Sequence, residues 1–135
     1  MIDTLTPSER SARMALVKAS NTKPEIAIRK LVYALGYRYR LHDKKLPGTP
    51  DLVFSSKKKI IFVHGCFWHR HASCKLARLP KSRLGFWLPK LESNRKRDLV
   101  SKRALKRMGW QVMIIWECQA GRTTWLGRQL SEFLE

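Results

Sequence analysis

The alternation of apolar and polar residues along the chain predicts a mixture of helices and strands. Two helix starts are marked near the N-terminus, TPSE at 6–9 and TKPE at 22–25, and each places a capping threonine before a proline and a glutamate. The first start predicts a helix to about residue 19. After the second, apolar residues recur at helical spacing as far as Gly36, which is suited to ending a helix.

Shorter apolar runs predict the strands. The alternating YRYRL at 37–41 favours a half-exposed strand, and the turn residues of 46–50 lead into a short strand at 51–54. The lysines at 57–59 suit a hairpin tip. Two runs are typical of buried strands, IIFV at 60–63 and WQVMIIW at 110–116. Helices are expected at about 86–91, 94–108 and 126–134, whereas 65–85 has no clear period.

This order of elements predicts one α/β domain over residues 1–135, with no internal repeat and no linker. The N-terminus lacks the features of a signal peptide. No apolar run approaches the roughly 20 residues that a membrane-spanning helix needs. We therefore expect a soluble, cytoplasmic protein.

The charge of the chain indicates a polyanionic partner. Lys and Arg number 28 against 10 acidic residues, a net charge of +18, and the segment 75–107 is strongly basic. Such a surface attracts nucleic acid. A merely solvated face and an anionic lipid surface are the alternatives, and no long basic amphipathic helix with a clean apolar face favours lipid.

The segment HGCFWHRHASC at 64–74 concentrates the candidate chemistry. Three of the four histidines and two of the three cysteines lie in it. Cys66, His71 and Cys74 form a C-x4-H-x2-C pattern, and Cys118 is available as a fourth ligand. Thiolate and imidazole are the donors that tetrahedral zinc prefers. The alternative is three buried free thiols beside a chance histidine, because an odd number of cysteines cannot all pair in disulfides.

Asp51 is a candidate for a second metal. It follows Pro50 and opens a strand, and the next strand ends in Val63 and His64. A carboxylate in that position can bind Mg²⁺ against a phosphate group. An aspartate that merely caps a turn after proline would give the same pattern.

Several motifs occur together and in a fixed order: LPGTPD at 46–51, VHGCFWH at 63–69, FWLPK at 86–90, Asn94-x-x-Arg97-Asp98, and IIWEC at 114–118. With the N-terminal RSARM and T-x-x-E sequences, they make the chain resemble the very short patch repair (Vsr) mismatch endonucleases of bacteria. The resemblance runs from about residue 10 to residue 118.

The resemblance implies a variant of the PD-(D/E)xK restriction-endonuclease fold, with a mixed central sheet flanked by helices. It implies a monomeric, Mg²⁺-dependent enzyme that nicks one DNA strand beside a T·G mismatch, the product of 5-methylcytosine deamination. It also implies a helical arm at about 6–20 that contacts DNA, a location at the bacterial nucleoid, and a functional link to a cytosine-5 methyltransferase and to other mismatch-repair proteins.

The same resemblance assigns catalytic roles. Asp51 matches the carboxylate that holds two Mg²⁺ ions, with the main-chain carbonyl of Val63 completing the metal shell. His69 matches the general base, His64 lies beside the phosphate, and Glu25 completes the polar shell. The positions of the second acid and the lysine of the wider superfamily fall at Phe62 and His64, a departure that is itself the pattern of the family. Val63 stands where relatives often carry threonine.

The resemblance further assigns Cys66, His71, Cys74 and Cys118 to one structural Zn²⁺. It assigns Phe67, Trp68 and Trp87 to a wedge that intercalates beside the mismatch, since unstacking a damaged base step is less costly than unstacking a matched one. Further DNA-binding residues are expected at Lys90, Asn94 and Arg97. His42 lies outside every motif, which predicts a surface loop position.

Two other functions are compatible with the residues alone. One is a nuclease of the same fold that cuts a different lesion or a specific sequence. The other is a zinc-stabilised DNA-binding module without catalysis, in which Asp51 and His69 are only structural.

Overall fold

A computed structural model describes residues 21–135 of the chain, and the helix expected at 6–19 therefore lies outside the described residues. The described part alternates strands and helices. Its elements are α2 (Lys23–Ala34), β1 (Arg40–Leu41), β2 (Leu52–Phe54), β3 (Lys59–His64), α3 (Leu84–Arg107), β4 (Gln111–Trp116) and α4 (Thr123–Leu134), with short 3-10 turns at Ser55–Lys57, Lys75–Ala77 and Glu117–Gln119.

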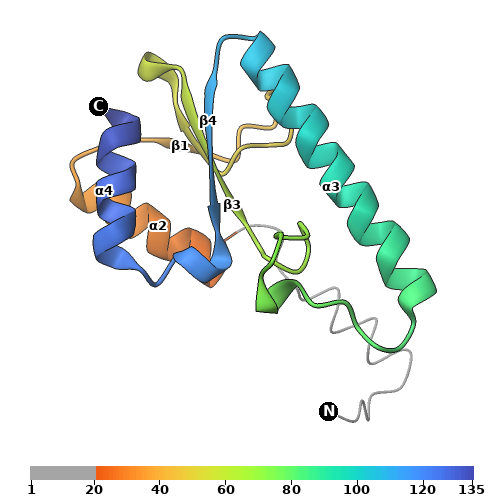
Figure 1. The fold of residues 1–135 in the computed structure, drawn as a ribbon. Coiled ribbons are helices and arrows are strands. Elements are labelled where there is room, and N and C mark those ends of the chain that lie inside the picture. Colours follow the sequence, from red (N-terminus) through yellow and green to blue (C-terminus); the bar gives the residue numbers. More distant parts are fainter. Residues whose placement is uncertain (1–20) are drawn as a thin grey trace.

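The four strands form one mixed sheet in the order β1-β2-β3-β4. The first three strands are antiparallel neighbours, and β4 runs parallel to β3 with Ile60 opposite Val112 and His64 opposite Trp116. Helix α3 connects these two parallel strands and lies on one side of the sheet, while α2 and α4 lie on the other (Figure 1). The α/β class with a mixed central sheet is thus confirmed.

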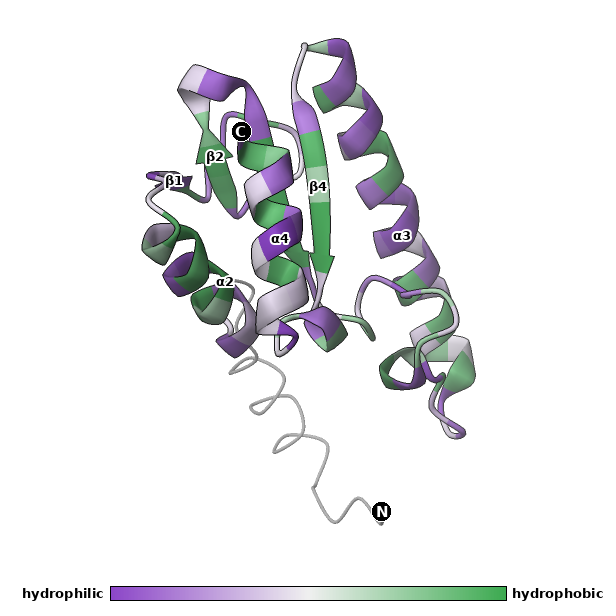
Figure 2. Cartoon of the chain, turned by 60° about the vertical axis from the view of Figure 1, so that its left-hand side comes forward, coloured by the Kyte–Doolittle hydropathy of each residue, from purple (hydrophilic) through white to green (hydrophobic). Residues whose placement is uncertain are grey.

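The alternation along the strands produces two cores. On the α2 and α4 side, Ile61 and Ile115 are fully buried against apolar residues of both helices, including Ile28 and Leu130. On the α3 side, Ile60 packs with Val53, Phe62 and Leu105. Strand β4 is apolar along most of its length, whereas polar bands follow α3 from end to end (Figure 2). No helix within residues 21–135 has the length and apolarity that crossing a bilayer requires.

The predicted boundaries hold where the signals are local. Thr22 caps α2 and its hydroxyl accepts a hydrogen bond from the Glu25 N–H. Gly36, with φ of +95°, and Gly109, with φ of +91°, follow the ends of α2 and α3. Lys58 lies at the tip between β2 and β3, the position that the lysine run suggested. Its backbone there is in the left-handed conformation.

Two predictions are wrong in extent. The strand expected at 37–41 is reduced to Arg40–Leu41, because the Tyr37 N–H is already bound to the Val32 carbonyl at the end of α2. The helices expected at 86–91 and 94–108 are one continuous helix that contains Pro89. Proline cannot donate to the Gly85 carbonyl, but Gly85 lies in the exposed first turn, where water can replace the missing donor.

Candidate active site and cysteine–histidine centre

Asp51 is held at the start of β2 by the backbone of the neighbouring strand. Its Oδ2 accepts a hydrogen bond of 2.7 Å from the Val63 N–H, because the antiparallel pairing of β2 with β3 brings the two residues together. Burial raises the pKa of the Asp51 carboxyl, and the bond from Val63 and the nearby His42, His69 and Arg29 offset that effect only in part. A cation bound beside this buried carboxyl group would stabilise its charged form.

His69 and Asp98 form a hydrogen-bonded pair. Asp98 lies in the middle of α3, and its Oδ2 is 2.6 Å from His69 Nδ1. A carboxylate oxygen can only accept, so Nδ1 carries the hydrogen, and in the neutral imidazole Nε2 is the nitrogen with a free lone pair. This arrangement orients an imidazole to remove a proton from water.

His64, the last residue of β3, stacks on the ring of His69, with centroids 3.9 Å apart and planes at 6°. Burial and the nearby His69 together lower the pKa of His64 to about 4, against the opposing effect of Asp98. His64 is only 5% exposed, and its Nδ1 has no hydrogen-bond partner among the described residues. The ring is therefore neutral near pH 7 and keeps an unused polar atom.

These groups share one cavity of about 500 Å³, with Asp51, Val63, His64, His69 and Asp98 in its wall. A second hollow adjoins it and shares His69 and Asp98 with it; this one is also lined by Asn94 and Arg97. Asn94 Nδ2 donates to the Trp68 carbonyl at 3.3 Å, and Arg97 donates to Asn94 Oδ1. The predicted site residues of the sheet and of α3 thus meet along one surface.

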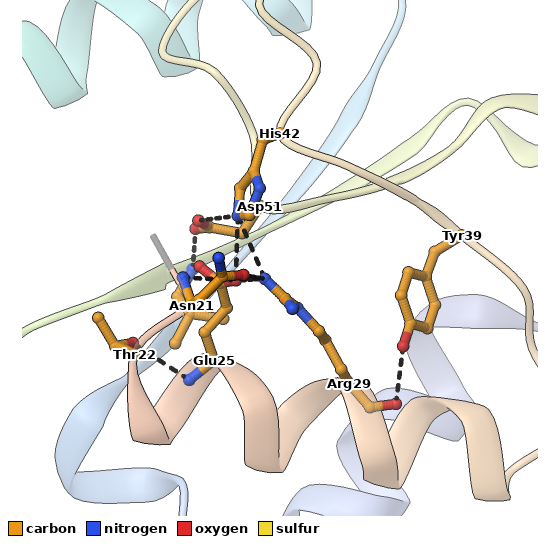
Figure 3. A network of polar contacts seen from close by, with 8 residues as sticks. Asn21, Thr22, Glu25, Arg29, Tyr39, His42 and Asp51 are labelled. Atoms are coloured by element: carbon orange, nitrogen blue, oxygen red, sulfur yellow. Dashed lines mark hydrogen bonds and ion pairs between the residues drawn. The ribbon is translucent and has the colours of Figure 1, made fainter. Parts of the chain in front are cut away.

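Glu25 approaches Asp51 from α2, and His42 approaches it from the segment between β1 and β2 (Figure 3). Glu25, in the first turn of α2, is 2% exposed, and its Oε2 is 3.0 Å from His42 Nε2. His42 Nε2 is 3.9 Å from Asp51 Oδ1. His42 does lie in a loop, as predicted, but its side chain is only 23% exposed and contacts Glu25, which the prediction of a surface position did not include.

The four predicted thiolate and imidazole ligands converge at the carboxyl ends of β3 and β4. One ligand atom from each of Cys66, His71, Cys74 and Cys118 lies within 4.8 Å of the others. Because His64 pairs with Trp116 in the parallel ladder, Cys66 and Cys118, each two residues further on, emerge side by side. His71 Nδ1 is 3.5 Å from the sulfur of each. Three sulfurs and one nitrogen are a donor set that suits a tetrahedral metal ion.

Further contacts hold the loop that follows β3, which carries Cys66 and His71. The His71 ring stacks on Trp116 at 4.1 Å, and the Cys66 N–H donates to Glu117 Oε1 at 3.2 Å. Cys66 is fully buried, and burial raises the pKa of its thiol to about 12. A thiol with so high a pKa is neutral near pH 7, and binding a metal ion through its sulfur would require it to lose the proton.

Phe67, Trp68 and Trp87, the residues that the resemblance assigns to a wedge, lie together in an aromatic cluster. Their ring centroids are 5.2 to 5.8 Å apart in edge-to-face pairs. Phe86, which was not predicted, extends the cluster and is 49% exposed. The Lys90 ammonium lies 5.6 Å from the Trp68 ring centroid and 6.0 Å from that of Trp87. An apolar surface bordered by a cation is thereby placed beside the cavity.

Sequence reasoning missed two residues of this site. Asp98 was noted only as part of a motif, and its partner His69 is 29 positions away. His42 lies 17 positions from Glu25 and belongs to no motif. The only available signals were the acid in the basic helix and the single histidine between two expected strands.

Comparison with known proteins agrees with this geometry. Residues 2–76 match the family model described as DNA mismatch endonuclease Vsr. The chain is 47% identical to the type II nicking enzyme V.XorIIP of Xanthomonas oryzae pv. oryzae, over all of this chain and 98% of that protein. It is 38% identical to the DNA mismatch endonuclease Vsr of Escherichia coli, over 100% of this chain and 86% of that protein. It is 42% identical to the type II nicking enzyme V.NmeAIP of Neisseria meningitidis, over 88% of this chain and 84% of that protein. The chain therefore belongs to the Vsr family of DNA mismatch endonucleases and is a nuclease.

Proposed function

We propose that this nuclease nicks one strand of duplex DNA beside a T·G mismatch by Mg²⁺-dependent hydrolysis of a phosphodiester bond. The observation that carries the proposal is the His69–Asp98 pair, with its 2.6 Å hydrogen bond, in the same cavity as the buried carboxylate Asp51. That combination supplies a base for water and an anionic group for a cation within one site.

The oxygen atoms at and near Asp51 are suitable ligands for a hard divalent cation. The Asp51 carboxylate, the Val63 carbonyl and the Glu25 carboxylate supply the oxygen atoms that Mg²⁺ prefers, and the raised pKa of Asp51 indicates a carboxylate in need of a positive partner. Bound there, up to two Mg²⁺ ions would polarise the phosphate and stabilise the charge that develops on it.

His69 is the general base of the proposed reaction. Its Nε2 removes a proton from the attacking water, whose oxygen forms the new bond to phosphorus. The bond from phosphorus to the 3′ oxygen breaks, and that oxygen gains a proton from solvent, so the products are a 5′-phosphate and a 3′-hydroxyl. Asp98 stabilises the imidazolium that forms. His64, neutral and stacked on His69, presents its ring to the phosphate.

Substrate selection is proposed to reside in the aromatic cluster. Phe67, Trp68 and Trp87 would enter the base stack beside the mismatch, where unstacking costs less than in matched DNA. Lys90, Asn94 and Arg97 would contact the DNA, and the remaining basic residues of α3 would neutralise phosphates. A Zn²⁺ held by Cys66, His71, Cys74 and Cys118 would fix the loop that carries Phe67 and Trp68.

The wider fold and setting follow from the family. The mixed sheet with helices on both sides is consistent with a PD-(D/E)xK variant in which His64 replaces the lysine. The substrate arises where 5-methylcytosine deaminates, so the enzyme would act in the bacterial cytoplasm alongside a cytosine-5 methyltransferase. One mismatch needs only one active site, which favours a monomer.

A panel of labelled duplexes tests the proposal. The protein is incubated with Mg²⁺ and with otherwise identical duplexes that carry T·G, C·G or A·C at one position, each strand labelled separately. We expect nicking of the T strand of the T·G duplex only, lost in Asp51→Asn and His69→Ala and retained in the control Glu132→Gln at an exposed position of α4. Equal nicking of matched duplexes would instead support a nuclease of the same fold that cuts a specific sequence.

A further inference from the structure

His42 connects two acidic groups that belong to different elements. It lies between β1 and β2, Glu25 lies in the first turn of α2, and Asp51 precedes β2. The His42 Nε2 is 3.0 Å from Glu25 Oε2 and 3.9 Å from Asp51 Oδ1 (Figure 3). One ligand atom from each of the three residues lies within 4.8 Å of the other two, which is close enough for a single cation to reach them all.

The direction of the hydrogen bond to Glu25 is set by chemistry. A carboxylate oxygen accepts and cannot donate, so His42 Nε2 carries the hydrogen. The same Glu25 oxygen also accepts from the Asn21 N–H at 3.2 Å and pairs with the Arg29 guanidinium. Three donors from three directions therefore fix one carboxylate that is 2% exposed.

The backbone of His42 is adapted to this task. Its N–H donates to the Asp51 carbonyl at 3.3 Å, so the ring and the aspartate are anchored to each other through the main chain as well. Its φ of +47° lies in the left-handed region, which is uncommon for a residue with a side chain and costs free energy that its surroundings must offset. In that conformation the imidazole contacts Glu25 while its side chain stays 23% exposed.

We propose that His42 is a positioning residue that holds Glu25 beside Asp51 at the separation from which both carboxylates serve one divalent cation. Two carboxylates this close repel each other, and a donor placed between them offsets the repulsion before the cation arrives. Orienting partners of this kind affect metal affinity about 10- to 100-fold when removed. The inference rests on the metal-dependent hydrolysis proposed above.

Two substitutions separate the hydrogen bond from the shape of the residue. His42→Gln keeps an N–H donor at a similar reach, whereas His42→Leu keeps bulk without a donor. Both variants place an ordinary side chain at the same positive φ, so any backbone cost is shared. Melting temperatures of the two variants within a few degrees of each other establish that the comparison is between folded proteins.

The probe is Mn²⁺, whose electron paramagnetic resonance signal reports binding without turnover. Free protein is titrated with Mn²⁺, and Asp51→Ala identifies the signal of this site. We expect His42→Leu to weaken Mn²⁺ binding about 10- to 100-fold and to raise the Mg²⁺ concentration for half-maximal nicking by a similar factor. His42→Gln should stay within about threefold of the wild type on both measures. Metal-free affinity for duplex DNA and kcat at saturating Mg²⁺ should change little in either variant.

The other outcomes overturn the inference in distinguishable ways. Asp51-dependent Mn²⁺ binding that is equal in wild type and His42→Leu removes the role of His42 and leaves the proposed function intact. A coupling from an imidazole nitrogen to bound Mn²⁺ that is lost in His42→Gln would make His42 a direct ligand instead. If the wild type neither binds Mn²⁺ nor nicks DNA with Mg²⁺, the proposed function fails and the inference fails with it.

Discussion

The ring of His64 lies flat against the ring of His69, with centroids 3.9 Å apart and planes at 6°. Of these two histidines, only His69 has a carboxylate partner within hydrogen-bond distance among the described residues. Stacking brings two imidazoles to the wall of one cavity while their environments keep them different. Burial and the neighbouring imidazole hold the pKa of His64 near 4. Asp98 fixes the tautomer of His69.

The role of Asp98 gives the first prediction. Asp98→Asn keeps the size of the side chain but can offer its amide N–H to His69 Nδ1, which favours the tautomer with hydrogen on Nε2. We expect kcat for nicking to fall about 10²- to 10⁴-fold, with the affinity for T·G duplex unchanged. The double variant Asp98→Asn, His69→Ala should be no slower than His69→Ala alone. Additive losses would show that Asp98 acts elsewhere.

The lowered pKa of His64 predicts a dependence of stability on pH. Between about 4 and the unfolded value of 6.5, the unfolded chain binds more protons at this residue than the folded protein does. The contribution of His64 to the free energy of unfolding is therefore complete above pH 6.5, and it falls as the pH drops toward 4. The largest loss is about 3 kcal/mol.

Urea unfolding of wild type and His64→Gln between pH 4 and 7.5 measures this dependence. Other titrating groups are common to both proteins, so the difference between the two curves isolates His64. We expect the wild type to lose more stability on acidification than the variant. Parallel curves would show that His64 titrates in the folded protein as it does in the unfolded chain.

The strands and two of the helices could be predicted from the sequence because their signals are local. Thr22, Pro24 and Gly36 mark α2 at both ends, and the apolar run at 111–116 leaves β4 little alternative to a buried strand. Helix α3 was divided in the prediction because Pro89 is a strong local breaker. Its solvent-exposed first turn tolerates the proline, and exposure is a property of the folded chain.

The site was predictable only where motifs carried it. Cys66 and Cys118 could be grouped through the family resemblance, and the parallel pairing of β3 with β4, which places them side by side, came only from the structure. The contact of His42 with Glu25 depends on how β1 registers with β2 and how α2 packs against the sheet. No spacing within the sequence encodes that geometry, so the loop position of His42 could be predicted but its contact with Glu25 could not.

We expect the charged Asp51 side chain to lower the free energy of unfolding of the metal-free protein. Its pKa is raised by burial, so the folded state binds the proton more tightly than the unfolded state does. Stability therefore falls as the pH rises through the interval between the two pKa values, and the full cost remains at neutral pH. Asp51→Asn removes the charge and keeps an oxygen that accepts from the Val63 N–H.

We accordingly expect Asp51→Asn to raise the melting temperature of the metal-free protein at pH 7 by a few degrees while abolishing nicking. Calorimetry with and without Mg²⁺ measures both effects. Added Mg²⁺ should stabilise the wild type and leave the variant unchanged, because a ligand stabilises only the protein that binds it. A lower melting temperature for the variant would mean that Asp51 is a net stabilising group.

The cysteine–histidine centre predicts a dependence on zinc. Purified protein should contain one Zn²⁺ per chain by mass spectrometry, and Cys74→Ser should contain less. Because a structural zinc site contributes directly to folding, its loss should lower the melting temperature by about 10 °C or more. Chelator-treated protein should regain the wild-type value with Zn²⁺ and not with Mg²⁺. A metal-free protein of unchanged stability would leave three free thiols as the correct interpretation.

The aromatic cluster and the basic face of α3 should separate in binding experiments. Trp68→Ala keeps the main-chain carbonyl that Asn94 binds and removes only the ring. Stacking is worth about 1–3 kcal/mol per base, so the preference for T·G over C·G duplex should fall about 5- to 100-fold. The dependence of affinity on salt should not change, because no charge is lost.

Lys96→Gln, at an exposed position of α3, should instead reduce the slope of log affinity against log salt by about 0.9 and preserve the preference for T·G over C·G duplex. Fluorescence anisotropy with both duplexes at several salt concentrations measures the two quantities together, and a wedge role for Trp68 is excluded if its loss changes only the salt slope.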